Sequence, residues 1–132
     1  PGASPVSMAR TFTFRDLEAW QKGMMLVETC YSLTNSFAKS ESYGLTSQIR
    51  RAAVSIPSNL AEGHCRRTTP AYLNHVSIAL GSFGEFQTCS EIAGRLGFLK
   101  RDDLQRILDL SDTVGRLLYG LYNSLERRVL KH

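Results

Sequence analysis

Apolar residues recur every three or four positions along four segments of the chain, which is the spacing of one face of an α-helix. The first segment predicts a helix from about Phe14 to Ala38. Its apolar residues form one stripe of Leu17, Trp20, Met24, Val27, Tyr31 and Thr34, and a second, neighbouring stripe of Leu26, Cys30, Leu33 and Phe37. Two adjoining stripes make a wider apolar surface than a single buried face requires.

The second segment predicts a helix that begins after a cap at Ser40 or Ser42 and ends at Glu62. Pro57 lies inside this helix, where it lacks an N–H and crowds the preceding turn. Because the apolar spacing keeps its phase across Pro57, we expect a kink in a continuing helix. Gly63 follows at a position that suits the end of a helix.

Two further helices follow. Thr68 and Thr69 before Pro70 form a helix-start signal, and the third helix is expected to run to about Leu96. Acidic residues Asp102 and Asp103 open the fourth helix, where they favour the helix dipole. This helix also carries a second apolar stripe of Ile107, Leu110 and Leu117, and it ends with Arg127, Arg128 and Lys131.

Four long helices with short connections, and no segment of period two, predict an all-α protein, an antiparallel up-and-down four-helix bundle. We assign residues 12–130 to this single domain and expect residues 1–11 to be a disordered tail, of which residues 1–7 need not be native. The surplus stripes on the first and fourth helices suggest a second buried surface in a homo-oligomer. Alternatively, the bundle core uses three or four positions in every seven.

Charge adds a candidate partner. The net charge is +4, and arginine supplies most of the positive charge. Arginine suits phosphate better than lysine does, so a polyanion such as RNA is a candidate ligand. Basic residues form three pairs, which are our candidate nucleic-acid contacts: Arg50 with Arg51, Arg66 with Arg67, and Lys100 with Arg101. The plainer alternative is that these are solvated charges in loops.

Sites for metals, cofactors or small-molecule substrates are not expected. His64, His75 and His132 are not spaced to chelate a metal, and no glycine-rich phosphate loop stands between a strand and a helix. Cys30, Cys65 and Cys89 show no paired spacing, so reduced thiols in a cytoplasmic protein are expected. We predict no membrane span and no secretory signal, because no long apolar run is present.

Polar residues line one face of the second helix: Arg51, Ser55, Asn59 and Glu62. On the third helix, Ser82 and Glu85 share a face. Because consecutive helices are antiparallel neighbours, we expect Ser55, Asn59, Glu62, Ser82 and Glu85 to form a structural polar network in which Glu62 and Glu85 meet Arg50, Arg51 or Asn59. The alternative is a pair of catalytic carboxylates, which no nucleophile or metal pattern supports.

The run from Gln48 to Gly63, QIRRAAVSIPSNLAEG, resembles the signature of the four-helix-bundle proteins encoded in intervening sequences of bacterial 23S ribosomal RNA genes. The opening FRDLEAWQK at residues 14–22 is similar too, and so is GSFGEFQT at residues 81–88, which departs from the family pattern at Phe86. The resemblance covers about residues 12–126. It implies a left-turning bundle, a homopentamer and a bacterial, cytoplasmic setting, but no established activity.

We therefore predict a non-enzymatic homo-oligomer associated with RNA or another nucleic acid. The alternative is a protein–protein adaptor, because a related branch of the family serves diversity-generating retroelements, where a reverse transcriptase would be the partner.

Overall fold

Residues 12–131, the part of the chain described by the computed structural model, are helical and contain no strand. They form α2 (Glu18–Thr34), α3 (Leu45–His64), α4 (Thr69–Arg95) and α5 (Arg101–Leu130), together with two short 3-10 helices, η1 (Phe14–Asp16) and η2 (Lys39–Glu41). The predicted all-α class is confirmed. The tail expected at residues 1–11 lies outside the described residues.

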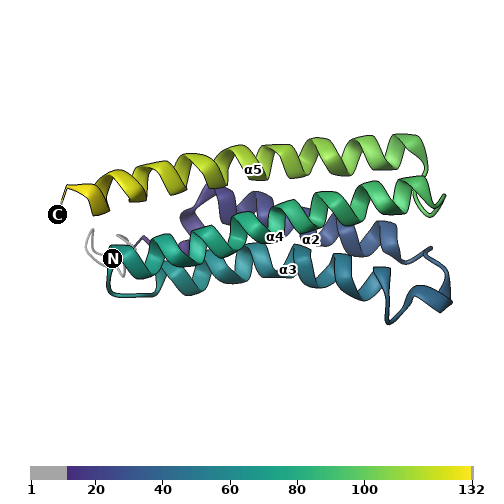
Figure 1. The fold of residues 1–132 in the computed structure, drawn as a ribbon, viewed down its shortest axis with the longest axis horizontal. Coiled ribbons are helices and arrows are strands. Elements are labelled where there is room, and N and C mark those ends of the chain that lie inside the picture. The colour runs from purple at the N-terminus through teal and green to yellow at the C-terminus, as the bar shows by residue number, and fades with distance from the viewer. Residues whose placement is uncertain (1–11, 132) are drawn as a thin grey trace, which may run out of the picture.

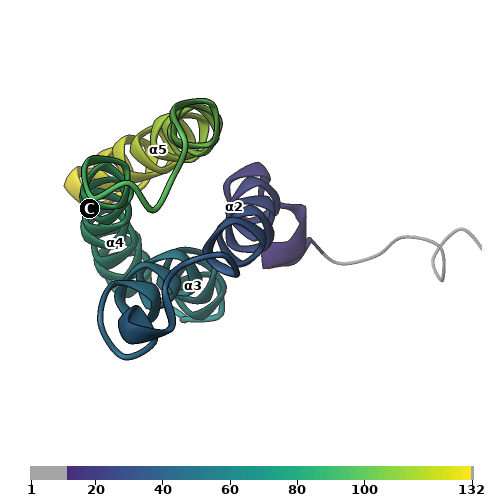
Figure 2. The ribbon, with the colours of Figure 1, turned by 90° about the vertical axis from the view of Figure 1, so that its right-hand side faces the viewer.

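The four long helices lie side by side along the longest axis of the molecule (Figure 1). The α3–α4 connection lies at the same end as the last turn of α5, and the α2–α3 and α4–α5 connections lie at the other end (Figure 1). Viewed along the bundle, the helices follow one another in chain order, and α2 and α5 face each other across the open side (Figure 2).

The first helix is shorter than the apolar pattern predicts. A separate 3-10 helix, η1, precedes α2, and a capping box stabilises its start. Thr13 Oγ1 accepts from the Arg15 N–H at 3.2 Å, and the Thr13 N–H donates to Asp16 Oδ2 at 2.8 Å. At the other end, the Thr34 hydroxyl donates to the Cys30 carbonyl at 2.8 Å. Phe37 is buried although it lies outside any helix, so its apolar character extended the predicted helix too far.

The second long helix begins later than predicted, at Leu45. Instead of a serine cap, Glu41 Oε1 accepts a hydrogen bond from the Leu45 N–H at 3.1 Å. The helix continues through Pro57 to His64, and the kink at Pro57 stays a prediction. Gly23 of α2 packs against this part of α3, and a Cβ there would stand 3.6 Å from Pro57 Cδ, which is ordinary van der Waals contact.

The core uses Leu26 and Cys30 from the second of the two apolar stripes predicted for the first helix, and Thr34 from the first. α2 buries Ala19, Gly23, Leu26, Cys30 and Thr34. Met24 and Tyr31, from the first stripe, keep 39% and 41% of their surface exposed. Ala19 and Gly23 are the small residues on the buried face of α2.

Candidate nucleic-acid interface

The six basic residues proposed as phosphate contacts lie at three separate places. Arg66 and Arg67 follow α3 in its connection to α4, and Lys100 and Arg101 begin α5 at the opposite end of the bundle. Arg50 and Arg51 lie on α3, between these ends. The structure therefore does not bring the three pairs into one patch within a single chain.

Arg50 is engaged inside the molecule. Its Nε donates to Thr34 Oγ1 at 2.8 Å, and a terminal nitrogen donates to Asn35 Oδ1 at 3.2 Å. The guanidinium also lies 4.4 Å from the centre of the Tyr31 ring. These contacts tie the end of α2 to α3, so Arg50 would have to give up several bonds to reach a phosphate.

Within residues 12–131, four of the other five basic residues have no side-chain partner. Arg66 pairs with Glu62 at 3.4 Å. Arg51, Arg67, Lys100 and Arg101 are exposed, and none of their side chains forms a hydrogen bond or an ion pair with another residue in the range 12–131. A solvated cation without a carboxylate partner is free to contact an external anion.

A polar network joins α3 and α4. The Ser82 hydroxyl donates to Ser55 Oγ at 2.7 Å, and Asn59 Nδ2 donates to the carbonyl and to the hydroxyl of Ser55 at 2.9 and 3.0 Å. Asn59 Oδ1 lies 3.0 Å from His75 Nδ1, and His75 Nε2 lies 3.9 Å from a Glu62 oxygen. The helices approach closely here, since a Cβ on Gly63 would stand 2.7 Å from His75 Cβ.

The two carboxylates do not meet the residues expected from the sequence. Glu85 accepts from Gln48 Nε2 at 3.3 Å, while Glu62 contacts Arg66 and His75. Among residues 12–131, neither carboxylate bonds to Arg50, Arg51 or Asn59. The two carboxylates take separate partners, so they form no shared acid–base pair.

The sequence pattern did not predict that His75 and Gln48 form polar contacts between α3 and α4. The signal that finds them is symmetry about the turn between antiparallel helices. Asn59 and His75 each stand eight residues from Arg67, and Gln48 and Glu85 stand nineteen and eighteen residues from it. Residues at equal distances from such a turn lie at the same height along the two helices.

The cysteines are all free thiols, two of them buried. Burial raises the pKa of Cys30 to about 12, with Arg50 lowering and Cys89 raising it to a lesser degree. Burial also raises the pKa of Cys89, and Glu85 adds to this. A thiol held in its protonated form is a poor nucleophile, so neither Cys30 nor Cys89 is suited to covalent chemistry.

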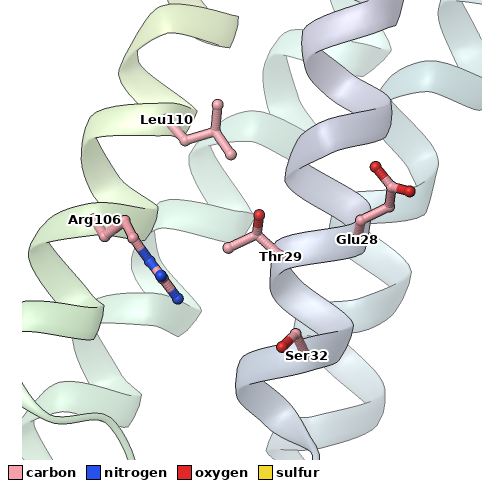
Figure 3. Close-up of a pocket in the computed structure, with 5 residues that line it drawn as sticks. All are labelled: Glu28, Thr29, Ser32, Arg106 and Leu110. Carbon is pink, nitrogen blue, oxygen red and sulfur yellow. The ribbon is translucent and has the colours of Figure 1, made fainter.

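A groove of about 490 Å³ lies between α2 and α5. Arg106 and Leu110 reach into it from α5, and Thr29 and Ser32 from α2, with Glu28 at its edge (Figure 3). Arg106 is 3.8 Å from Asp103 on its own helix. The lining contains one aliphatic side chain among polar ones, whereas small-molecule pockets are mostly apolar and enclosed.

Within residues 12–131, no group of three or more histidine, cysteine, aspartate or glutamate side chains is placed to hold a metal ion. Over the same residues, no helix combines the length and apolar composition needed to cross a bilayer.

The helices and their packing define a small all-α protein with four long helices. The chain belongs to the 23S rRNA-intervening sequence protein family, whose family model matches residues 15–120. The resemblance seen in the sequence motifs is thereby confirmed.

A solved structure shares the fold. It is the crystal structure of a protein of unknown function from the S23 ribosomal protein family of Bacteroides thetaiotaomicron VPI-5482, with a TM-score of 0.74 and 20% identity. The match covers 79% of this chain and 97% of that one. At this identity the likeness supports the fold alone. No match was found among curated protein sequences.

Proposed function

We propose that this protein is a non-enzymatic, self-assembling RNA-associated protein of the bacterial cytoplasm. The observation that carries the RNA association is the set of exposed, unpaired cations Arg51, Arg67, Lys100 and Arg101 on a chain of net charge +4. Such cations bind phosphate by releasing counterions, without reading the base sequence. The family name refers to ribosomal RNA genes, which agrees with this proposal but does not carry it.

Self-assembly is supported by apolar side chains on two outer faces. Met24, Met25 and Tyr31 are between 39% and 46% exposed on α2, and Ile78 and Ile92 are 45% and 41% exposed on α4. Apolar surface gathered on one helix face is typical of protein interfaces. The assembly implied by the family resemblance is a homopentamer, in which the free cations of five chains would act on the same ligand.

The RNA proposal is tested by fluorescence anisotropy with a labelled, structured RNA at several salt concentrations. We expect binding at about 50 mM salt that weakens steeply toward about 200 mM, because each phosphate contact releases a counterion. Absence of binding at the lowest salt would overturn the proposal. The double variant Arg51→Gln with Arg67→Gln should bind more weakly, and a Thr88→Gln variant on the exposed face of α4 serves as the neutral control.

Self-assembly is tested by light scattering coupled to gel filtration. We expect a mass about five times the 14.7 kDa of one chain. Two double variants compare the outer faces: Met24→Gln with Tyr31→Gln, and Ile78→Gln with Ile92→Gln. At least one should lower the mass. A monomeric wild-type protein would contradict self-assembly. The apolar faces of α2 and α4 would then be candidate contacts for a different protein, as in the adaptor alternative.

A further inference from the structure

The two ends of the bundle carry different charge. We define the basic end as residues 12–18, 62–69 and 126–131, and the opposite end as residues 35–44 and 91–103. The basic end holds six cations, Arg15, Arg66, Arg67, Arg127, Arg128 and Lys131, against four carboxylates, Asp16, Glu18, Glu62 and Glu126. The opposite end holds four cations, Lys39, Arg95, Lys100 and Arg101, against four carboxylates, Glu41, Glu91, Asp102 and Asp103. The positive charge is therefore concentrated at one end.

The members of the basic end come from distant parts of the sequence. The last turn of α5 extends past the α3–α4 connection, at the same end of the molecule (Figure 1). Burial raises the pKa of Tyr72, in the first turns of α4, and Arg128 opposes this shift, which agrees with the closeness of α5 to the start of α4. The Tyr72 ring lies 5.7 Å from that of His64, at the end of α3.

Most cations at the basic end form no side-chain bond with another described residue. Arg66 pairs with Glu62. Arg67, Arg127, Arg128 and Lys131 are exposed and form no side-chain hydrogen bond or ion pair with any other described residue. The sequence alone already explains three of these cations, because positive charge stabilises the C-terminal end of a helix, where Arg127, Arg128 and Lys131 lie. They lie at the same end of the bundle as Arg67.

An exposed aromatic ring stands at the same end. The Phe12 ring packs 5.7 Å from the ring of His64, yet 58% of Phe12 remains exposed. Phe12, His64 and Tyr72 thus form a row of rings that ends at the surface. An aromatic ring on a positively charged surface is the arrangement on which unpaired bases stack while cations hold the backbone.

We propose that the basic end binds a single-stranded segment of RNA, with Arg67, Arg127, Arg128 and Lys131 on its phosphates and Phe12 stacked on a base. This inference rests on the proposed RNA association and narrows it to one end and one form of RNA. A duplex keeps its bases stacked inside, so it could use the cations but not the ring. An anionic membrane would likewise use the cations alone.

The test compares two variants that each remove two arginines and one lysine. One is Arg127→Gln, Arg128→Gln and Lys131→Gln at the basic end; the matched control is Lys39→Gln, Arg95→Gln and Arg106→Gln, three exposed cations outside the basic end that are not among the proposed RNA contacts. Anisotropy is measured between about 50 and 200 mM salt with a labelled single strand of about 20 uridines, with a blunt RNA duplex of the same length and with anionic vesicles. Circular dichroism verifies that each variant is folded.

We expect the wild-type protein to prefer the single strand. The basic-end variant should reduce the slope of log affinity against log salt by about 2, since each phosphate contact to a single strand contributes about 0.7, while the control leaves the slope unchanged. Phe12→Ala should weaken single-strand binding about tenfold with no change for the duplex, and Phe12→Trp should restore it.

Four results would overturn the inference. Equal losses in the two triple variants would remove the basic end as the site while leaving RNA association intact. Equal affinity for duplex and single strand, or no effect of Phe12→Ala, would show that Phe12 does not stack on a base. Binding to vesicles but to neither RNA would end the inference and the proposed function together.

Discussion

The α3–α4 pair and the α2–α5 pair are both neighbours in the bundle, but they are held together in different ways. Hydrogen bonds cross between α3 and α4 at three levels, from Ser82 to Ser55, between Asn59 and His75, and from Gln48 to Glu85. Between α2 and α5, no side-chain hydrogen bond or ion pair is formed by the described residues, and a groove of about 490 Å³ separates them.

The difference follows the order of the helices along the chain. Asn59 and His75 are 16 residues apart, so a short connection brings them together. α2 and α5 are the first and last long helices, and closing the loop between them costs more chain entropy. The α3–α4 pair is therefore expected to form early and to carry most of the stability, and the α2–α5 contact to close last and open first.

Removing a large core side chain from the α3–α4 pair should have the largest effect. Phe86 on α4 has no exposed surface, so Phe86→Ala should lower the free energy of unfolding by about 3–5 kcal/mol through lost burial and an unfilled cavity. Leu110→Ala, at the half-buried groove, should lower it by about 1 kcal/mol. Urea unfolding followed by circular dichroism measures both. Equal losses of unfolding free energy in the two variants would show that the α3–α4 and α2–α5 pairs contribute equally to stability.

A smaller change tests how closely α3 and α4 approach. The added methyl of Gly63→Ala would meet His75 Cβ at 2.7 Å, next to the backbone, so we expect a loss of about 1–3 kcal/mol. In the control, Gly81→Ala, the methyl group meets nothing within 4 Å, and better helix propensity should add up to about 1 kcal/mol. Thermal melts at matched concentration decide between these signs. If Gly81→Ala lowered the stability as much as Gly63→Ala does, then neither helix propensity nor contacts within one chain would explain the two changes.

The smallest expected effect concerns how firmly α2 is seated on α3. The pKa of Cys30 rises from 9.0 to about 12 on folding, so the folded chain holds the thiol proton more tightly than the unfolded chain does. The resulting stabilisation is complete below about pH 9 and declines by at most about 1.4 kcal/mol per pH unit until about pH 12. Urea unfolding at about pH 8 and pH 10 should therefore show a loss that Cys30→Ala lacks. The same alkaline loss in both proteins would assign it to other groups.

The fold class could be predicted from the sequence because helical periodicity and start signals are local. Thr68 and Pro70 predict the start of the third helix, and α4 begins at Thr69, with the Thr68 hydroxyl accepting from the Ala71 N–H at 3.3 Å. The choice between two neighbouring stripes on the first helix was not predictable. That choice depends on which helices flank α2, and this is a property of the whole bundle.

The candidate interface was only partly predictable, for a related reason. Runs of adjacent cations such as Arg66 and Arg67 are visible in the sequence. The grouping of Arg67 with Arg127 and Arg128 is not, because sixty residues separate them and only the lengths of α4 and α5 bring them to the same end. Arg50, in contrast, looks in the sequence like its neighbour Arg51, but it is bound by Thr34 and Asn35.

An even number of long helices has a practical consequence. Phe12 and Lys131, the first and last described residues, both lie at the basic end, Phe12 through its contact with His64 and Lys131 after the last turn of α5. An affinity tag fused directly before Phe12 or directly after Lys131 would therefore be attached at the basic end and would add its own charge there. Tyr43, in the α2–α3 connection, has 99% of its surface exposed at the far end, and a cysteine placed there would carry a fluorophore well away from the ligand.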